Sequence, residues 1–74
     1  MTEEERLAWG AQEHRTRIED IAAVKRGEIT LAEAQKRARR RSRESGMTPH
    51  QSYSAMIEGN RADRRTPQES SSAT

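Results

Sequence analysis

The side chains best suited to chemistry lie in the short stretch from Thr48 to Asn60. Ser54 and Glu58 are four residues apart, so on a helix a hydroxyl and a carboxylate would lie on one strip of the surface. Gly59 follows, and a glycine just after the last helical residue typically ends a helix. A carboxylate held at such an end can form a charge-assisted pair with a guanidinium of another molecule. The stretch therefore predicts a carboxylate that is presented to a partner.

The same stretch carries the signals of a helix start. Thr48 and Gln51 match a capping box, and Pro49 falls at the first helical position, where its missing N–H costs nothing. We therefore expect a short helix over residues 49–58. Apolar side chains three and four positions apart share one face of it. We assign these side chains, and the tryptophan near the N-terminus, to partner binding. The four residues are Trp9, Tyr53, Met56 and Ile57.

The segment Ser54-Ala55-Met56-Ile57-Glu58-Gly59-Asn60 resembles the inhibitory helix associated with Fic-domain AMP-transferases, (S/T)-x-x-x-E-(G/N). A second segment, Arg26-Gly27-Glu28-Ile29-Thr30 followed by Glu33-Ala34, is similar to a stretch of some small antitoxins of that family. The two segments stand here in the reverse order.

The resemblance implies that Glu58 is an inhibitory carboxylate, with Ser54 and Gly59 as the supporting motif positions. In that family the glutamate pairs with an arginine of the catalytic loop that would otherwise hold the γ-phosphate of ATP. On this interpretation the chain is a non-enzymatic, antitoxin-like inhibitor of a larger Fic-domain toxin. Its Glu58 would block binding of the ATP γ-phosphate, because carboxylate and phosphate compete for the same guanidinium.

An Arg-rich block supports an alternative function. Six of the eight residues 36–43 are basic, and such side chains neutralise phosphates and release counterions. The alternative is thus a small basic regulatory protein that binds nucleic acid or another polyanion. Cations are also favoured near a helix C-terminus, so a solvated helix end would explain the block as well. Its basic residues are Lys36, Arg37, Arg39, Arg40, Arg41 and Arg43.

Catalytic and metal-binding patterns are missing from the sequence. It has no nucleophile beside a base and no Gly-rich phosphate loop. It also has no cysteine, and its two histidines, His14 and His50, are far apart. We therefore expect neither enzymatic activity, nor a cofactor, nor a metal site.

Composition limits the chain to one small domain. Only 30% of its 74 residues are hydrophobic and 35% are charged, so little apolar surface can be buried. No apolar run approaches the roughly 18 residues that cross a bilayer, and the acidic N-terminus does not resemble a signal peptide. We expect a cytoplasmic protein with no membrane partner. Residues 1–34 carry eight acidic and five basic side chains, and residues 35–74 carry four and nine, so the halves have opposite net charge.

The expected fold is all-α, with helices over residues 3–26, 31–45 and 49–58. The first two helices open with capping boxes, and a glycine follows each as a stop signal. We predict an antiparallel pair with the third, short helix folded back. Residues 1–60 would form the helical binding domain, and the polar residues 61–74 a disordered tail.

A heptad-like seam runs along the first helix. Its members recur at spacings of four and three, which is typical of a helix–helix contact. Assembly of a homo-oligomer through this seam is a third interpretation of the chain. The seam residues are Leu7, Ala11, His14, Ile18 and Ile21.

Overall fold

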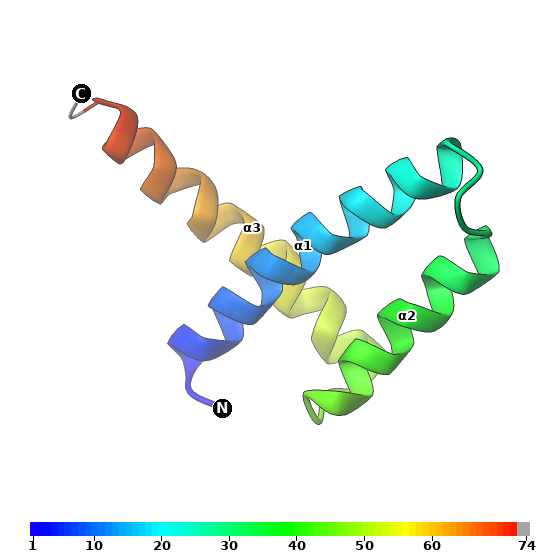
Figure 1. Ribbon diagram of the computed structural model, residues 1–74. Helices are drawn as coiled ribbons and strands as arrows, with labels where there is room; N and C mark the ends of the chain where they lie inside the picture. The colour runs from blue at the N-terminus through cyan, green and yellow to red at the C-terminus, as the bar shows by residue number, and fades with distance from the viewer. Residues whose placement is uncertain (73–74) are drawn as a thin grey trace.

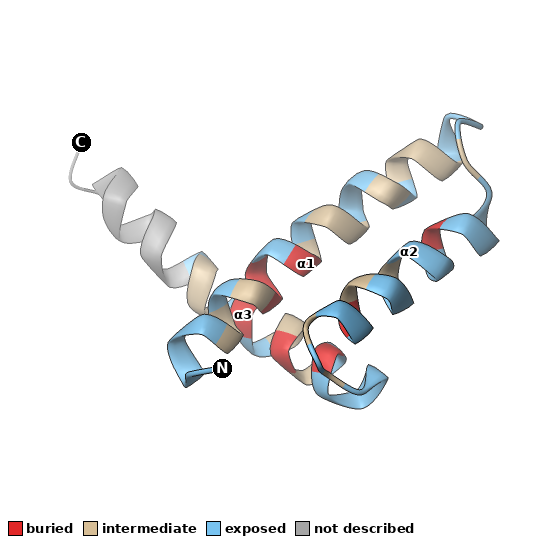
Figure 2. Cartoon of the chain, turned by 60° about the horizontal axis from the view of Figure 1, so that its bottom comes forward, coloured by how far each residue is buried: buried red, intermediate tan, exposed pale blue. Residues whose placement is uncertain are grey.

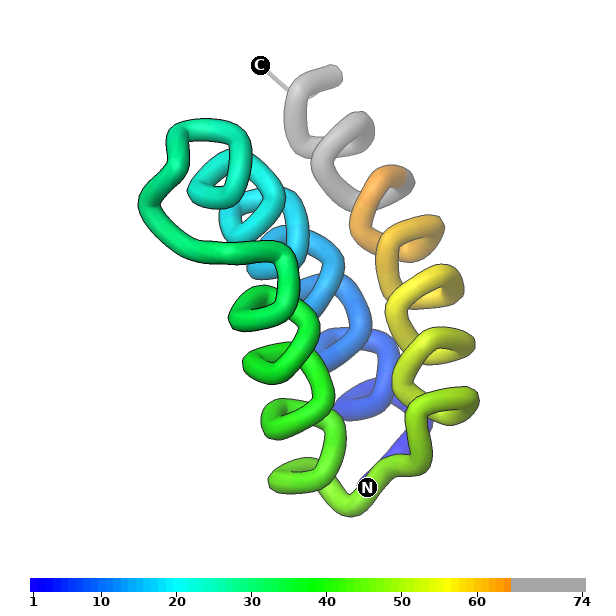
Figure 3. The backbone as a smooth tube through the Cα atoms, turned by 90° about the vertical axis from the view of Figure 1, so that its right-hand side faces the viewer, coloured from blue at the N-terminus to red at the C-terminus, as the bar shows by residue number. Residues whose placement is uncertain are grey.

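The computed structural model describes the backbone of residues 1–72 and the side chains of residues 1–64. In that part of the chain it has three helices and no strand: α1 (Glu3–Lys25), α2 (Leu31–Glu44) and α3 (Pro49–Ser72). The all-α prediction is confirmed. α2 runs back alongside α1, and α3 crosses α1 (Figure 1). Seen from the side, α1 lies between α2 and α3 (Figure 3), so α1 is the element on which the other two pack.

All three helices begin where the sequence predicts, because each has a complete capping box. In each box a threonine hydroxyl accepts from the backbone N–H three residues later. The side chain of that third residue accepts from the threonine N–H, and the six distances lie between 2.8 and 3.4 Å. Gly27 and Gly46 follow α1 and α2 with φ of 76° and 75°, the left-handed conformation expected of a stop glycine.

The third helix does not end at Gly59, so its predicted boundary at residue 58 is wrong. Gly59 is helical and buried against α1, where a Cβ would overlap the backbone of Leu7 and Ala11. On α1, a Cβ at Gly10 would overlap the backbone carbonyl of Ala55. Two glycines thus allow the backbones of α1 and α3 to approach closely. In this chain Gly59 serves packing and does not terminate the helix.

The helix therefore continues into the segment that composition assigned to a disordered tail. Residues 61–64 are helical, and Asp63 accepts a hydrogen bond of 2.8 Å from Arg15 of α1. Ala62 lines a surface cavity together with Leu7 and Ala8 of α1. The packed part of α3 therefore extends beyond Gly59. Residues 73–74 of the predicted tail lie outside the described residues.

The core is small and centred where α3 crosses α1. Its buried apolar side chains are Ala11, Ala34 and Ala55. Figure 2 shows buried positions at the crossing and along one face of α2. The predicted seam of α1 divides here: its members up to His14 are buried or half-buried, whereas Ile18 and Ile21 are 54% and 50% exposed. Among the described residues, no helix is both long and apolar enough to span a bilayer.

Candidate functional site

Glu58 lies on the surface of α3, with its side chain 47% exposed. The guanidinium of Arg6, on α1, donates to Glu58 Oε1 at 2.7 Å. Arg6 also binds both carboxylate oxygens of Glu3, at 2.7 and 3.0 Å. The carboxylate that the sequence predicts for a partner's arginine is thus already paired with an arginine of its own chain. No spacing rule relates Arg6 to Glu58, because they meet only through the crossing of α1 and α3.

Ser54 and Glu58 lie on one strip of α3, as their spacing predicts, and both are beside Arg6. Ser54 is half-buried and lines, together with Arg6 and His50, a surface groove of about 360 Å³. Gly59, the third position of the motif, is instead buried against α1. Two of the three motif residues therefore remain accessible, and the third is part of the core.

The four apolar side chains predicted to bind a partner differ in exposure. Tyr53 is 54% exposed. Trp9, Met56 and Ile57 are half-buried. Of the four, Tyr53 therefore offers the most surface to another molecule.

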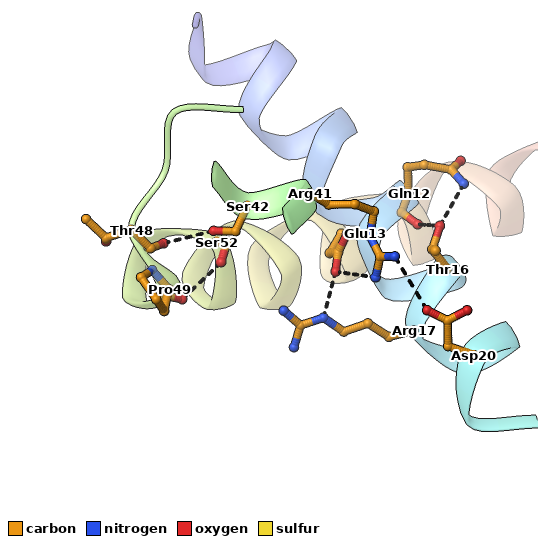
Figure 4. Close-up of polar contacts among 10 residues, drawn as sticks. All are labelled: Gln12, Glu13, Thr16, Arg17, Asp20, Arg41, Ser42, Thr48, Pro49 and Ser52. Atoms are coloured by element: carbon orange, nitrogen blue, oxygen red, sulfur yellow. Dashed lines mark hydrogen bonds and ion pairs between the residues drawn. The ribbon is translucent and has the colours of Figure 1, made fainter. Parts of the chain in front are cut away.

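The Arg-rich block is divided by a polar cluster between α1 and α2 (Figure 4). Arg41 makes a bidentate pair with Glu13, with Nε 2.6 Å from Oε1 and a terminal nitrogen 3.0 Å from Oε2. Arg41 also donates to Asp20 at 3.4 Å, and Arg37 lies 3.8 Å from the other oxygen of Asp20. Arg17 completes the group by donating to Glu13 at 2.8 Å. We call these five residues the ionic cluster.

Glu13 is the centre of the ionic cluster and is only 3% exposed. Burial raises the pKa of its carboxyl group, but the hydrogen bonds from Arg41 and Arg17 outweigh burial and hold the pKa below its ordinary value of 4.5. The same hydrogen bond to Glu13 raises the pKa of Arg41. Glu13 therefore stays ionised at neutral pH, and its charge is matched within the fold.

The other four basic residues of the block lie on the opposite side of α2. At 3.6 residues per turn they fall within about 100° of the helix circumference, facing away from Ala34 and Ala38. All four are exposed, and none forms an ion pair with a side chain in the described range 1–64. We call this surface the outer cationic face; it comprises Lys36, Arg39, Arg40 and Arg43.

The ionic cluster was not predicted from the sequence, although helical spacing places its members on facing sides of α1 and α2. Asp20 follows Glu13 by seven residues, and Arg41 follows Arg37 by four, so two carboxylates share one face of α1 and two guanidinium groups share one face of α2. Matching these two carboxylates to these two guanidinium groups was the signal that could have paired α1 with α2.

The chain matches no family model, no curated protein and no solved structure. Within residues 1–64, no group of three or more His, Cys, Asp or Glu side chains is arranged to hold a metal ion. The candidate functional sites of the described residues are therefore two surfaces, the Ser54–Glu58 strip and the outer cationic face.

Proposed function

We propose that this protein is an antitoxin-like inhibitor of a Fic-type AMP-transferase, with Glu58 as the inhibitory residue. The observation that carries the proposal is the pairing of Glu58 with a guanidinium. The carboxylate accepts from Arg6 at 2.7 Å while remaining 47% exposed. A surface carboxylate that binds an arginine within its own chain has the chemistry needed to bind one on an enzyme.

Inhibition would proceed by exchange of one arginine for another. Glu58 would leave Arg6 and pair with the catalytic-loop arginine that otherwise holds the ATP γ-phosphate. Arg6 would not be left unpaired, because it keeps two hydrogen bonds to Glu3. Breaking the Arg6–Glu58 pair therefore costs the inhibitor little free energy, because this ion pair lies at the surface.

Arg6 would also limit the potency of the inhibitor. In the free chain it occupies one carboxylate oxygen of Glu58, so it competes with the arginine of the enzyme. Replacement of Arg6 by glutamine removes this competitor and leaves the carboxylate in place. Under the proposed mechanism, Arg6→Gln therefore inhibits at lower protein concentrations than wild type does.

The test is an adenylylation assay with a Fic-domain enzyme encoded beside this gene and ATP labelled at its α-phosphate. Wild-type protein should abolish label transfer, and Glu58→Gln should restore it while still co-purifying with the enzyme. Glu3→Gln is the matched control, because it also removes one carboxylate partner of Arg6 from an exposed position. Glu3→Gln should inhibit as wild type does.

Three outcomes would reject the proposal. In the first, wild-type protein leaves label transfer unchanged. In the second, Glu58→Gln inhibits as strongly as wild type, so that Glu58 is not the inhibitory group. Equal loss of inhibition in Glu3→Gln and Glu58→Gln would also reject it, because the Arg6 contacts and not the Glu58 carboxylate would then be responsible.

A further inference from the structure

The positive charges of the outer cationic face take no part in the ion pairs between the helices of residues 1–64. Arg37 and Arg41 are turned toward the acidic residues of α1, whereas the four remaining cations have no ion-pair partner among side chains 1–64. The face extends from Lys36 to Arg43, which is about 10 Å along the axis of α2. Unpaired cations in a row of this length match the repeated charges of a nucleic-acid backbone.

A groove with an aromatic wall adjoins this face. It has a volume of about 360 Å³ and runs between α2 and the first turns of α3, with Arg17 of α1 also lining it. Arg39 belongs both to the outer cationic face and to this groove. Tyr53 lines the groove from α3 and is 54% exposed, and Gln35 lines it from α2. The structure thus places Tyr53 beside an Arg-rich segment that ends ten residues earlier in the sequence.

These groups have complementary uses toward a nucleotide. An exposed tyrosine ring provides a stacking surface for a base, and base–aromatic stacking tolerates any base. The amide of Gln35 can both donate to and accept from the edge of a base. The neighbouring arginines carry the charge that phosphates require.

We propose that this surface binds single-stranded nucleic acid, with a base in the groove against Tyr53 and phosphates along the outer cationic face. A single strand fits better than a duplex, because only unstacked bases can enter a groove beside an aromatic ring. A duplex would contact the cations and leave Tyr53 unused. This inference does not depend on the proposed inhibitor function, since Glu58 does not line the groove.

The test measures fluorescence anisotropy of labelled single-stranded RNA and DNA of about 12 nucleotides, with duplexes of the same sequence for comparison. Wild-type protein should prefer the single strands. The affinity should fall as the salt concentration rises from about 50 to about 200 mM, with a log–log slope of about −3 for four phosphate contacts. Absence of binding at the lowest salt, or tighter binding of the duplex, would overturn the inference.

Variants distinguish binding at the outer cationic face from general attraction between a basic protein and phosphates. Arg39→Ala/Arg40→Ala/Arg43→Ala should lose more than about tenfold in affinity and flatten the salt slope by about 2. The matched control, Lys25→Ala/Arg61→Ala/Arg64→Ala, removes equal charge from exposed positions elsewhere. It should lose far less, and an equal loss in both variants would overturn the inference.

Tyr53 tests the groove itself. Tyr53→Ala should lose about tenfold in affinity for single strands, and Tyr53→Phe should retain wild-type affinity because the ring is kept. Helix content measured by circular dichroism verifies that each variant is folded. If the folded Tyr53→Ala variant binds as well as wild type, no base occupies the groove and the inference is wrong.

Discussion

The two helix contacts of α1 are built by opposite means. Against α3, α1 presents glycine and alanine, so the backbones of the two helices meet directly at Gly10, Ala55 and Gly59. Against α2, it presents the buried carboxylate of Glu13, which binds two arginines. The first contact depends on the absence of side-chain volume, and the second depends on matched charge.

This difference predicts different weaknesses. Close packing is disturbed by any added atom. The two ion pairs beside it, Arg6–Glu58 and Arg15–Asp63, lie at the surface, so pH and salt should affect this contact little. A buried ion pair is disturbed by loss of either partner, because the remaining charge is then buried without compensation. α1 thus carries one contact that is sensitive to volume and one that is sensitive to charge.

The largest effect is expected from Gly59→Ala. In an ordinary helix interior this change would stabilise by about 1 kcal/mol, because alanine is the better helix former. Here the new Cβ overlaps the backbone of Leu7 and Ala11, so the two helices must move apart. We expect a net loss of about 3 kcal/mol or more, which is a large fraction of the free energy of unfolding of so small a domain. Urea denaturation followed by far-UV circular dichroism measures it.

Gly46→Ala is the matched control. Apart from its chain neighbours, no residue in the described part of the chain has an atom within 4 Å of a Cβ at Gly46, and its φ of 75° makes the change unfavourable only through the backbone. We expect a loss of about 1 kcal/mol. If Gly59→Ala costs no more than this control, the direct approach of the helix backbones is not what limits the α1–α3 contact.

The second effect concerns the ionic cluster. Glu13→Ala leaves Arg41 and Arg17 without their shared carboxylate, and we expect a loss of about 2 kcal/mol. The loss is below that of a fully buried pair, because the side chains of Arg41 and Arg17 are 26% and 32% exposed and can regain water. Hydrogen exchange should show lower protection in α2 than in wild type, with the α1–α3 crossing retained.

A double substitution distinguishes the loss of the ion pair from the cost of leaving Arg41 half-buried without its partner. In Glu13→Leu/Arg41→Met the buried pair is replaced by apolar side chains, and much of the stability should return. Uniform loss of protection over all three helices in Glu13→Ala would contradict the separation of the two contacts.

The sequence predicted the helix starts well, because a capping box is a local signal over four residues. Thr2, Thr30 and Thr48 each begin a helix as expected. The predicted helix end at Gly59 was wrong for a physical reason. Glycine permits both a left-handed turn and a close approach of two backbones, and only the partner helix decides between them.

The residues of the candidate sites could be predicted from the sequence, but their ion-pair partners could not. Ser54 and Glu58 share a strip because helical spacing alone determines it. That Glu58 meets Arg6 depends on where α3 crosses α1, which no pattern within either helix encodes. For the same reason the Arg-rich block could be recognised, but not its division into Arg37 and Arg41 on one side and the outer cationic face on the other.

A smaller effect is expected from acidification. The pKa of Glu13 is below 4.5 in the folded state, so folding favours its ionised form. Its contribution to stability is therefore complete above about pH 4.5 and is lost as the pH falls through the folded-state pKa. Hydrogen bonds also lower the pKa values of Glu3, Glu5 and Glu28, so these groups contribute to the loss of stability at low pH as well.

The contribution of Glu13 is isolated by comparison with Glu13→Gln. Denaturation from about pH 6 to about pH 3 should show a shallower fall in stability for the variant than for wild type. Parallel curves would mean that the exposed carboxylates alone account for the acid sensitivity, and that the charge of Glu13 is not what holds α2 against α1.

The smallest effect should come from the surface pair between Arg15 and Asp63. These side chains are 2.8 Å apart, but they are 48% and 44% exposed, so water and salt screen the attraction. We expect Asp63→Asn to cost less than about 1 kcal/mol and to lose its effect in high salt. Chemical denaturation by urea at low and high salt measures this. A loss comparable to that of Glu13→Ala would mean that charge also secures α3, and the two contacts of α1 would then differ less than their geometry indicates.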